Sequence, residues 1–153
     1  MRPAQTPIGL QLTRASRSVS RAFDDALAAA GGSLPTWLVL LAMKSHTAGS
    51  QRQLAEAVGV REATLTHHLN ALETAGLITR RRDPANRRIH VVELTRTGDE
   101  MFSRLRAVAS TFDQRLRGDL GDDDIARLRD LLSRLAANVG AELADSAPWA
   151  GLG

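Results

Sequence analysis

The spacing of apolar residues along the chain predicts a mainly helical fold. Apolar side chains recur every three or four positions within 6–46, 50–75 and 95–144, as they do on one face of a helix. Two short segments between these stretches, 78–82 and 89–94, read instead as strands around the turn DPANRR. The order predicts an α+β fold that consists mainly of helices and contains one small β-hairpin.

Local signals delimit the helices of the N-terminal region. Thr6 is placed to cap a first helix, Pro7 suits its first turn, and the glycine pair at 31–32 ends it. The segment 34–46 is apolar on nearly every side, so we expect a second helix that is buried on several faces.

Residues 50–76 carry the pattern of a helix-turn-helix. Ser50 and Gln53 match a capping box, which satisfies two backbone donors at the start of a helix. Gly59 can take the left-handed conformation that turns the chain, and a second helix is expected over 61–75. Two such helices joined at a glycine are typical of DNA-binding helix-turn-helix units.

The second of these helices has two contrasting faces. Leu65, Leu69 and Leu72 share one side and are expected to be buried. The opposite side carries small and polar residues and no acidic group: Ala63, His67, Asn70 and Thr74, flanked by Thr64, Thr66 and Ala71. Such a face suits insertion into the major groove of DNA.

The predicted hairpin is strongly basic. The segment from Ile78 to Val92 holds five arginines and one aspartate. A basic ribbon that directly follows a recognition-type helix is typical of a wing that contacts phosphates. A solvated basic loop is the alternative for this run of charge when it is considered alone.

Composition narrows the class of protein. The chain has no cysteine, which excludes disulfides and thiol-based redox switches. No apolar stretch is long enough to span a bilayer and no signal peptide is evident, so we expect a cytoplasmic protein that does not enter a membrane. Residues 44–94 carry eight basic and five acidic groups, a net +3, which places the basic excess in the helix-turn-helix and wing.

The helices that flank this unit predict a homodimer. The unit has a small core of its own, expected at Leu54, Val58, Leu65, Leu69 and Leu72. The terminal helices therefore have little left to cover within one chain, and burial against a second copy is expected. The last helix has the longest apolar stripe: Ile125, Leu128, Leu132, Leu135, Val139 and Leu143. The alternative is a monomer whose terminal helices fold over the winged unit.

Three segments resemble the MarR family of bacterial transcriptional regulators. They are LPTWLVLLAM in the second helix, LNALETAGLITR at the exit of the recognition helix, and RRRDPANRRIHVVELTRTG in the wing. The resemblance spans residues 6–144. It implies one domain over 1–153, with a winged helix-turn-helix at 47–94, a helical dimerisation region formed by 6–46 and 95–144, and a frayed tail at 145–153.

The resemblance also implies a function and a set of contacts. We expect a repressor of a nearby or divergent promoter that binds double-stranded DNA at a pseudo-palindromic operator. Arg88 matches the family's wing-tip arginine, whereas Asn86 replaces the aspartate that usually orients it. The expected DNA contacts, with Arg80 and Arg87 assigned to phosphates, are Arg61, Thr64, Thr66, His67, Asn70, Arg80, Arg87 and Arg88.

Proteins of this family commonly bind a small aromatic or lipophilic effector between the dimer helices and the winged unit. The resemblance places Trp37 at that cleft, and Arg14 and Arg17 of the first helix are candidates to meet a carboxylate. For Trp37 the alternative is core packing, and for the two arginines it is a solvated helix face.

Nothing in the sequence favours catalysis, a metal or a cofactor. His67 and His68 are adjacent, and neighbouring side chains on a helix diverge by about 100°, so they do not converge on one ion. Asp122 to Asp124 are expected to stabilise the start of a helix. Two other classes stay open: an architectural DNA binder of low sequence specificity and a winged-helix protein–protein adaptor.

Overall fold

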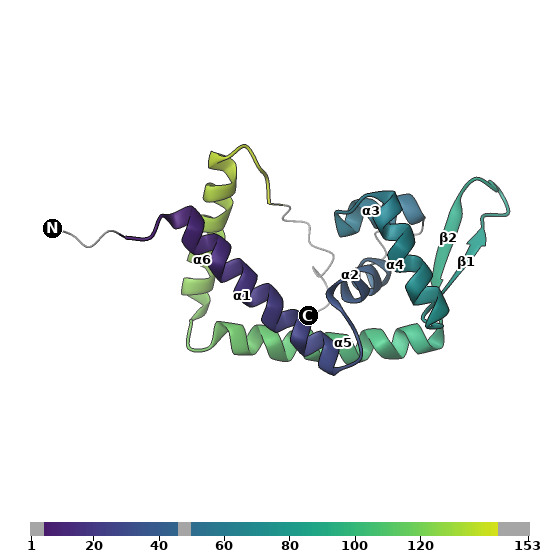
Figure 1. Cartoon of the computed structure of the whole chain (residues 1–153), viewed down its shortest axis with the longest axis horizontal. Helices are drawn as coiled ribbons and strands as arrows, with labels where there is room; N and C mark the ends of the chain where they lie inside the picture. The colour runs from purple at the N-terminus through teal and green to yellow at the C-terminus, as the bar shows by residue number, and fades with distance from the viewer. Residues whose placement is uncertain (1–4, 46–49, 144–153) are drawn as a thin grey trace.

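A long helix, α5 (Arg96–Arg117), underlies the whole molecule in the computed structural model, which describes residues 5–45 and 50–143. At one end of α5 lie α2 (Leu34–Lys44), α3 (Gln51–Val58), α4 (Glu62–Thr74) and a hairpin of β1 (Ile78–Arg82) with β2 (His90–Leu94). The helix α1 (Ile8–Ala29) crosses α5, and α6 (Asp122–Asn138) stands at the other end (Figure 1). This element order confirms the predicted α+β fold.

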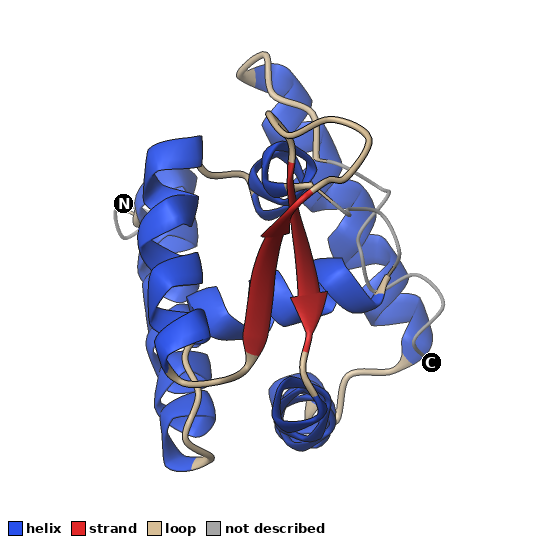
Figure 2. Ribbon diagram, turned by 90° about the vertical axis from the view of Figure 1, so that its right-hand side faces the viewer, coloured by secondary structure: helices blue, strands red, loops and turns tan. Residues whose placement is uncertain are grey.

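The hairpin is a two-stranded antiparallel sheet in which Ile78 pairs with Leu94 and Arg82 pairs with His90. Figure 2 shows the ribbon in front of the helices, with β2 leading into the end of α5. An isolated bridge between Ser50 and Val91 attaches the start of α3 to β2. The wing is therefore attached to the helix-turn-helix at two points: the start of α3, through this bridge, and the end of α4, which leads into β1.

The fold has two clusters of buried apolar residues, and α2 contributes to both. Val39 and Ala42 belong to a cluster with α3, α4 and the hairpin, whereas Trp37, Leu40 and Leu41 belong to a cluster with α1 and α5. The prediction that the second helix is buried on several faces is confirmed.

The local signals predicted for α3 are confirmed, and α5 has a cap of the same kind. The Ser50 hydroxyl accepts a hydrogen bond from the Gln53 backbone N–H at 3.2 Å, and the Gln53 side chain accepts one from Ser50 N–H at 3.1 Å. Gly59 is left-handed, with φ of 75°. Thr95 caps α5 by accepting a bond from Gly98 N–H at 3.0 Å, and its hydroxyl donates to the Gly76 carbonyl at 2.6 Å.

Three predicted boundaries were wrong. The N-cap of α1 is Pro7, whose carbonyl accepts bonds from two backbone N–H groups, and Thr6 lies one residue outside. Ile89 belongs to the wing loop because its backbone bonds to Asn86 and Asp83, so β2 begins at His90. The helix α6 ends at Asn138, before the left-handed Gly140, although the apolar pattern continues to Leu143. The predicted end of the second helix at His46 and the tail 145–153 lie outside the described residues.

The prediction that the terminal helices find little to cover within one chain was wrong for α1 and α5. Leu27 of α1 is fully buried, and Phe23 stacks on Phe112 of α5 with ring centroids 4.9 Å apart. In contrast, no residue of α6 is buried. The expected core of the reading unit was also incomplete, because Val58 is only partly buried and α2 supplies part of that cluster.

No single helix among the described residues is both long and apolar enough to cross a membrane. Within the described ranges one pair of consecutive helices, α1 and α2, reaches such a length and composition when taken together, and the two meet at an angle of 80°.

We predict that Gly98→Ala lowers the free energy of unfolding by about 1–3 kcal/mol, as overpacking does. Gly98 is buried in the first turn of α5, and a Cβ there would lie 2.9 Å from the Leu77 carbonyl carbon and closer still to its oxygen. Urea denaturation followed by circular dichroism measures the change. Ser103→Ala, at an exposed position of the same helix, is the control and should leave stability unchanged or raise it by less than about 1 kcal/mol. A Gly98→Ala protein as stable as the parent would contradict the packing described.

Candidate nucleic-acid interface

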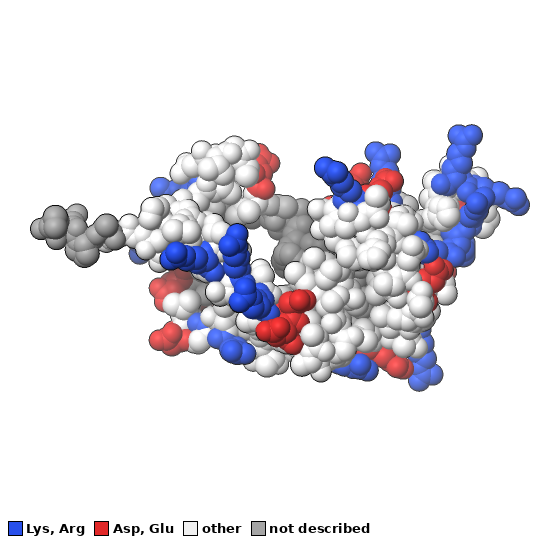
Figure 3. All heavy atoms as spheres, in the orientation of Figure 1, with Lys and Arg blue, Asp and Glu red and all other residues white. Residues whose placement is uncertain are grey.

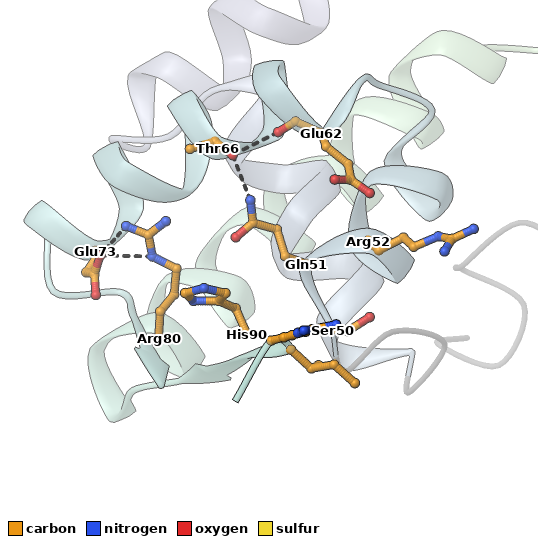
Figure 4. Close-up of a pocket in the computed structure, with 10 residues that line it drawn as sticks. Ser50, Gln51, Arg52, Glu62, Thr66, Glu73, Arg80 and His90 are labelled. Atoms are coloured by element: carbon orange, nitrogen blue, oxygen red, sulfur yellow. Dashed lines mark hydrogen bonds and ion pairs between the residues drawn. The ribbon is translucent and has the colours of Figure 1, made fainter. Parts of the chain in front are cut away.

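A groove of about 780 Å³ runs between the recognition-type helix α4, the start of α3 and the wing (Figure 4). Each of the three elements contributes side chains to it. Its lining includes Gln51, Arg52, Thr66, Glu73, Arg80, Arg88 and His90. The groove carries side chains of both signs of charge, so the pairing of those charges decides which of them can act on a ligand.

The outward face of α4 is as the sequence predicted. Leu65, Leu69 and Leu72 are buried. Six of the seven residues expected on the opposite side are exposed: Ala63, Thr64, His67, Asn70, Ala71 and Thr74. This face carries no charge when His67 is neutral. Its hydroxyl, imidazole and amide groups can donate hydrogen bonds to base edges or accept hydrogen bonds from them.

Two predicted contacts lie at the rim of that face. Arg61 is the N-cap residue of α4, is exposed, and makes no side-chain capping bond. The Thr66 hydroxyl is already engaged: it donates to the Glu62 carbonyl at 2.9 Å and accepts from the Gln51 side-chain amide at 2.6 Å. Thr66 thus holds α3 against α4, and its only hydroxyl proton is not free for a base.

The wing loop is shaped by its own side chains. The Asp83 carboxylate accepts a bond from Ala85 N–H at 2.8 Å, and the Asn86 side-chain oxygen accepts one from Arg88 N–H at 3.2 Å. Asn86 therefore fixes the backbone of Arg88, although it cannot form the salt bridge that an aspartate would form.

Two of the five wing arginines are compensated by glutamates. Arg81 pairs with Glu93 across the hairpin, with 2.8 Å between Nη2 and Oε1. This hydrogen-bonded pair raises the pKa of Arg81 and lowers the pKa of Glu93. Arg80 pairs with Glu73 of α4, and its side chain is only 19% exposed.

The remaining wing arginines are Arg82, Arg87 and Arg88. All three are exposed, and none has an ion-pair partner within residues 5–45 and 50–143. Figure 3 shows arginine side chains projecting from the hairpin end of the molecule. The positive charge available to an anionic ligand is therefore concentrated in the wing loop and at the end of β1.

The expected assignment of Arg80 to a phosphate does not suit its geometry. Its guanidinium donates two bonds to the Glu73 carboxylate, at 2.9 and 2.5 Å, and one to the Asn70 side-chain oxygen at 2.6 Å. Since its charge is neutralised and its side chain is mostly buried, Arg80 is a poor phosphate contact. Neither Glu73 nor Gln51 was predicted, because their partners are distant in sequence.

The three residues expected to contact an effector are not brought together. Arg14 lines a shallow hollow at the start of α1 with Thr6 and Ile8, and Arg17 is exposed on the same helix. Trp37 is 8% exposed and stacks on Phe102 in the core, with centroids 5.6 Å apart. Its contact with an effector stays a prediction.

A second cavity, of about 330 Å³, lies between α2, α4 and α5. Its lining includes Thr36, Leu72, Leu77, Met101 and Arg104. No three His, Asp or Glu side chains of the described ranges are placed to hold a metal ion.

Comparisons with known proteins agree on one family. A model of the MarR family matches residues 33–90, from the N-cap of α2 to the first residue of β2. The HTH-type transcriptional regulator YdgJ of Bacillus subtilis (strain 168) is 31% identical over 90 residues, which cover 59% of this chain and 55% of YdgJ. The match thus spans about half the length of that curated relative.

Solved structures match over more of the chain. The repressor CouR bound to a 23-mer DNA duplex is 29% identical, with a TM-score of 0.77 over 85% of this chain and 92% of CouR. CouR from Rhodococcus jostii RHA1 bound to p-coumaroyl-CoA is 25% identical, with a TM-score of 0.72 over 86% and 95%. The transcriptional regulator PA3341 is 30% identical, with a TM-score of 0.72 over 88% and 98%. The matched family, the shared fold and these identities show that the chain belongs to the MarR family of winged-helix transcriptional regulators.

Proposed function

We propose that the protein is a sequence-specific DNA-binding repressor of a nearby or divergent promoter. One observation carries the proposal: α4 exposes a face of uncharged polar residues, and Asn70 on that face accepts a hydrogen bond from Arg80, which lines the groove between α4 and the wing together with the exposed Arg88. A helix with polar side chains reads base edges, and unpaired arginines attract phosphates. The DNA complex of CouR, 29% identical to this chain, supports the same use of the fold.

The protein would bind its operator as a homodimer. The helix α6 buries no residue within its own chain, and an apolar groove of about 490 Å³ between α6 and the start of α1 is lined by Leu12, Leu132 and Leu135. Val139 is 80% exposed. A second copy that covers this surface would set two recognition helices one duplex turn apart, roughly 34–36 Å, which corresponds to a pseudo-palindromic site.

In this proposal the chain has the two regions that the sequence predicts. Residues 47–94 read DNA, and 6–46 with 95–144 form the helical region that makes the dimer. The helix α2 belongs to the second region by position but shares its core with the first. The protein would act in the bacterial cytoplasm at the nucleoid, and we propose no enzymatic activity, since its relatives are regulators.

We further propose that a small aromatic or lipophilic effector releases the DNA. The cavity between α2, α4 and α5 is the best candidate site, because it touches the recognition helix on one side and the long helix on the other. In it, Arg104 supplies the positive charge that Arg14 and Arg17 were expected to supply. The complex of CouR with p-coumaroyl-CoA supports control by a ligand of this kind.

Selection of duplex DNA from a random pool, repeated at several salt concentrations, tests the function. A repressor should select a pseudo-palindrome and bind it at least about 10³-fold more tightly than competitor DNA. An architectural binder would bind with a shallow specificity ratio, and an adaptor would show little salt-dependent affinity for any duplex.

We predict that Arg88→Ala weakens operator binding by about 1–3 kcal/mol and leaves the dimer and its helix content unchanged. Arg88 is exposed and unpaired in the described part of the chain, and a narrow minor groove concentrates the negative potential that attracts such a side chain. Fluorescence anisotropy at moderate salt measures the effect. An unaltered operator affinity would remove Arg88 from the interface.

Arg87→Ala should reduce the slope of log affinity against log salt by about 1, because one phosphate contact is lost. The preferred base sequence should not change, since phosphate contacts carry no sequence information. Arg127→Ala, on the distant helix α6, is the control and should leave both unchanged. A changed base preference with an unchanged slope in Arg87→Ala would reverse the assignment.

Leu132→Glu should give a monomer or aggregate in light scattering and abolish operator binding. Leu132 lies on the apolar stripe of α6, and a carboxylate buried there without a partner costs several kcal/mol. Ser133→Glu adds the same charge to an exposed neighbouring position and should remain a DNA-binding dimer. A soluble monomer that binds the operator with full affinity would contradict the dimer proposal.

A further inference from the structure

The groove holds a three-residue network that joins the wing to the recognition helix. Arg80 projects from β1 and donates to Glu73 and Asn70 of α4. Figure 4 shows its guanidinium against the Glu73 carboxylate at one end of the groove. One atom, Nη2, bonds to both partners, at 2.5 Å to Glu73 and at 2.6 Å to Asn70.

This network orients the amide of Asn70. A guanidinium has only N–H donors, so the group that Asn70 turns toward Arg80 must be its oxygen. The amide nitrogen then points away from Arg80. Asn70 is exposed on the face of α4 that also carries His67 and Thr74, so its nitrogen keeps both N–H donors for a ligand on that face, whereas its oxygen has one of its two lone pairs engaged by Arg80.

Glu73 holds Arg80 in this place. Its carboxylate accepts hydrogen bonds from both Nε and Nη2 of Arg80. The Arg80 side chain is 19% exposed and the Glu73 side chain is 40% exposed. The compensated charge removes most of the attraction that a phosphate would exert on Arg80. Arg80 should therefore keep its hydrogen bond to Asn70 when DNA is bound.

The orientation matters because adenine and guanine need different groups from asparagine. A free asparagine recognises adenine with both ends of its amide, since the oxygen accepts from N6 and the nitrogen donates to N7. Guanine instead presents two adjacent acceptors, N7 and O6, which an amide nitrogen alone can satisfy. An asparagine whose oxygen is turned toward an arginine presents mainly its nitrogen to a base, and the two donors of that nitrogen suit guanine better than adenine.

We infer that Glu73 and Arg80 are positioning residues that make Asn70 a guanine reader. This inference rests on the proposed DNA-binding function. At the base pair that faces Asn70, the operator should carry guanine in preference to adenine. Arg80 then sets specificity by restricting another residue, and it touches no phosphate.

Selection of operator sequences with matched variants tests the inference. Asn70→Ala should lose base preference at one position in each half-site, and that position should be guanine in the parent. Arg80→Leu frees the amide of Asn70, so preference at the same position should shift toward adenine by roughly 5- to 150-fold, the discrimination of one bidentate contact. Glu73→Ala releases Arg80 in a second way and should shift the preference in the same direction.

Two further proteins separate positioning from loss of structure. Arg81→Leu removes a neighbouring arginine that is also paired with a glutamate, and it should leave base preference unchanged whatever its affinity. In the Asn70→Ala background, Arg80→Leu should have no further effect on preference at that position, because the group that it orients is absent.

The possible results distinguish the inference from the function on which it rests. A guanine preference that survives both Arg80→Leu and Glu73→Ala, or an adenine at the position lost in Asn70→Ala, would overturn the inference. An Asn70→Ala protein with every preference intact would overturn it as well, while sequence-selective binding by the parent would still support the function. A parent protein that selects no sequence would refute the proposed function itself, whether or not its binding of duplex DNA depends on salt.

Discussion

The burial of α2 on several sides is the constraint on which the rest of the structure depends. Its residues divide between the cluster under the helix-turn-helix and the cluster under α1 and α5. Lys44 at its C-terminal end also pairs with Asp99 of α5 and lies 5.5 Å from the Phe102 ring. Because packed interiors deform little, α2 couples the packing of α1 and α5 to that of the helix-turn-helix, alongside the direct bond of Thr95 to the Gly76 carbonyl at the end of α4.

Charge pairing decides how the basic wing can work. Five arginines within one short hairpin suggest five phosphate contacts, but glutamates on α4 and β2 neutralise Arg80 and Arg81. The remaining arginines, Arg82, Arg87 and Arg88, lie toward the tip of the ribbon. At the base of the wing, Arg80 fixes the hairpin to α4 and Arg81 links its two strands. The tip of the wing carries the uncompensated positive charge. This division of labour suits a wing that must hold a defined place relative to the recognition helix.

The two ends of the molecule differ in how fully they satisfy their apolar surface. The second half of α1 is covered by α5 through Phe23 and Leu27, whereas the first half exposes Ile8 and Leu12 beside α6. Exposed apolar surface of this kind marks an interaction site. The apolar surface lies at the end of α5 opposite the wing, so a partner seated there leaves the DNA-reading face open (Figure 1).

The sequence by itself determined the features that depend on neighbours within a few residues. The capping box at Ser50, the left-handed Gly59 and the two faces of α4 depend on residues close together in the sequence, and each was predicted. Only the tertiary structure decided the pairings between distant elements. The bonds that join Arg80 to Glu73 and Asn70 and the stacking of Phe23 on Phe112 depend on how whole helices and strands are placed. The sequence shows how many charged and apolar side chains need a partner in the folded protein. Which partners they find is set by packing, because the free energy of an ion pair or a buried side chain depends on its distance to groups far away in the chain.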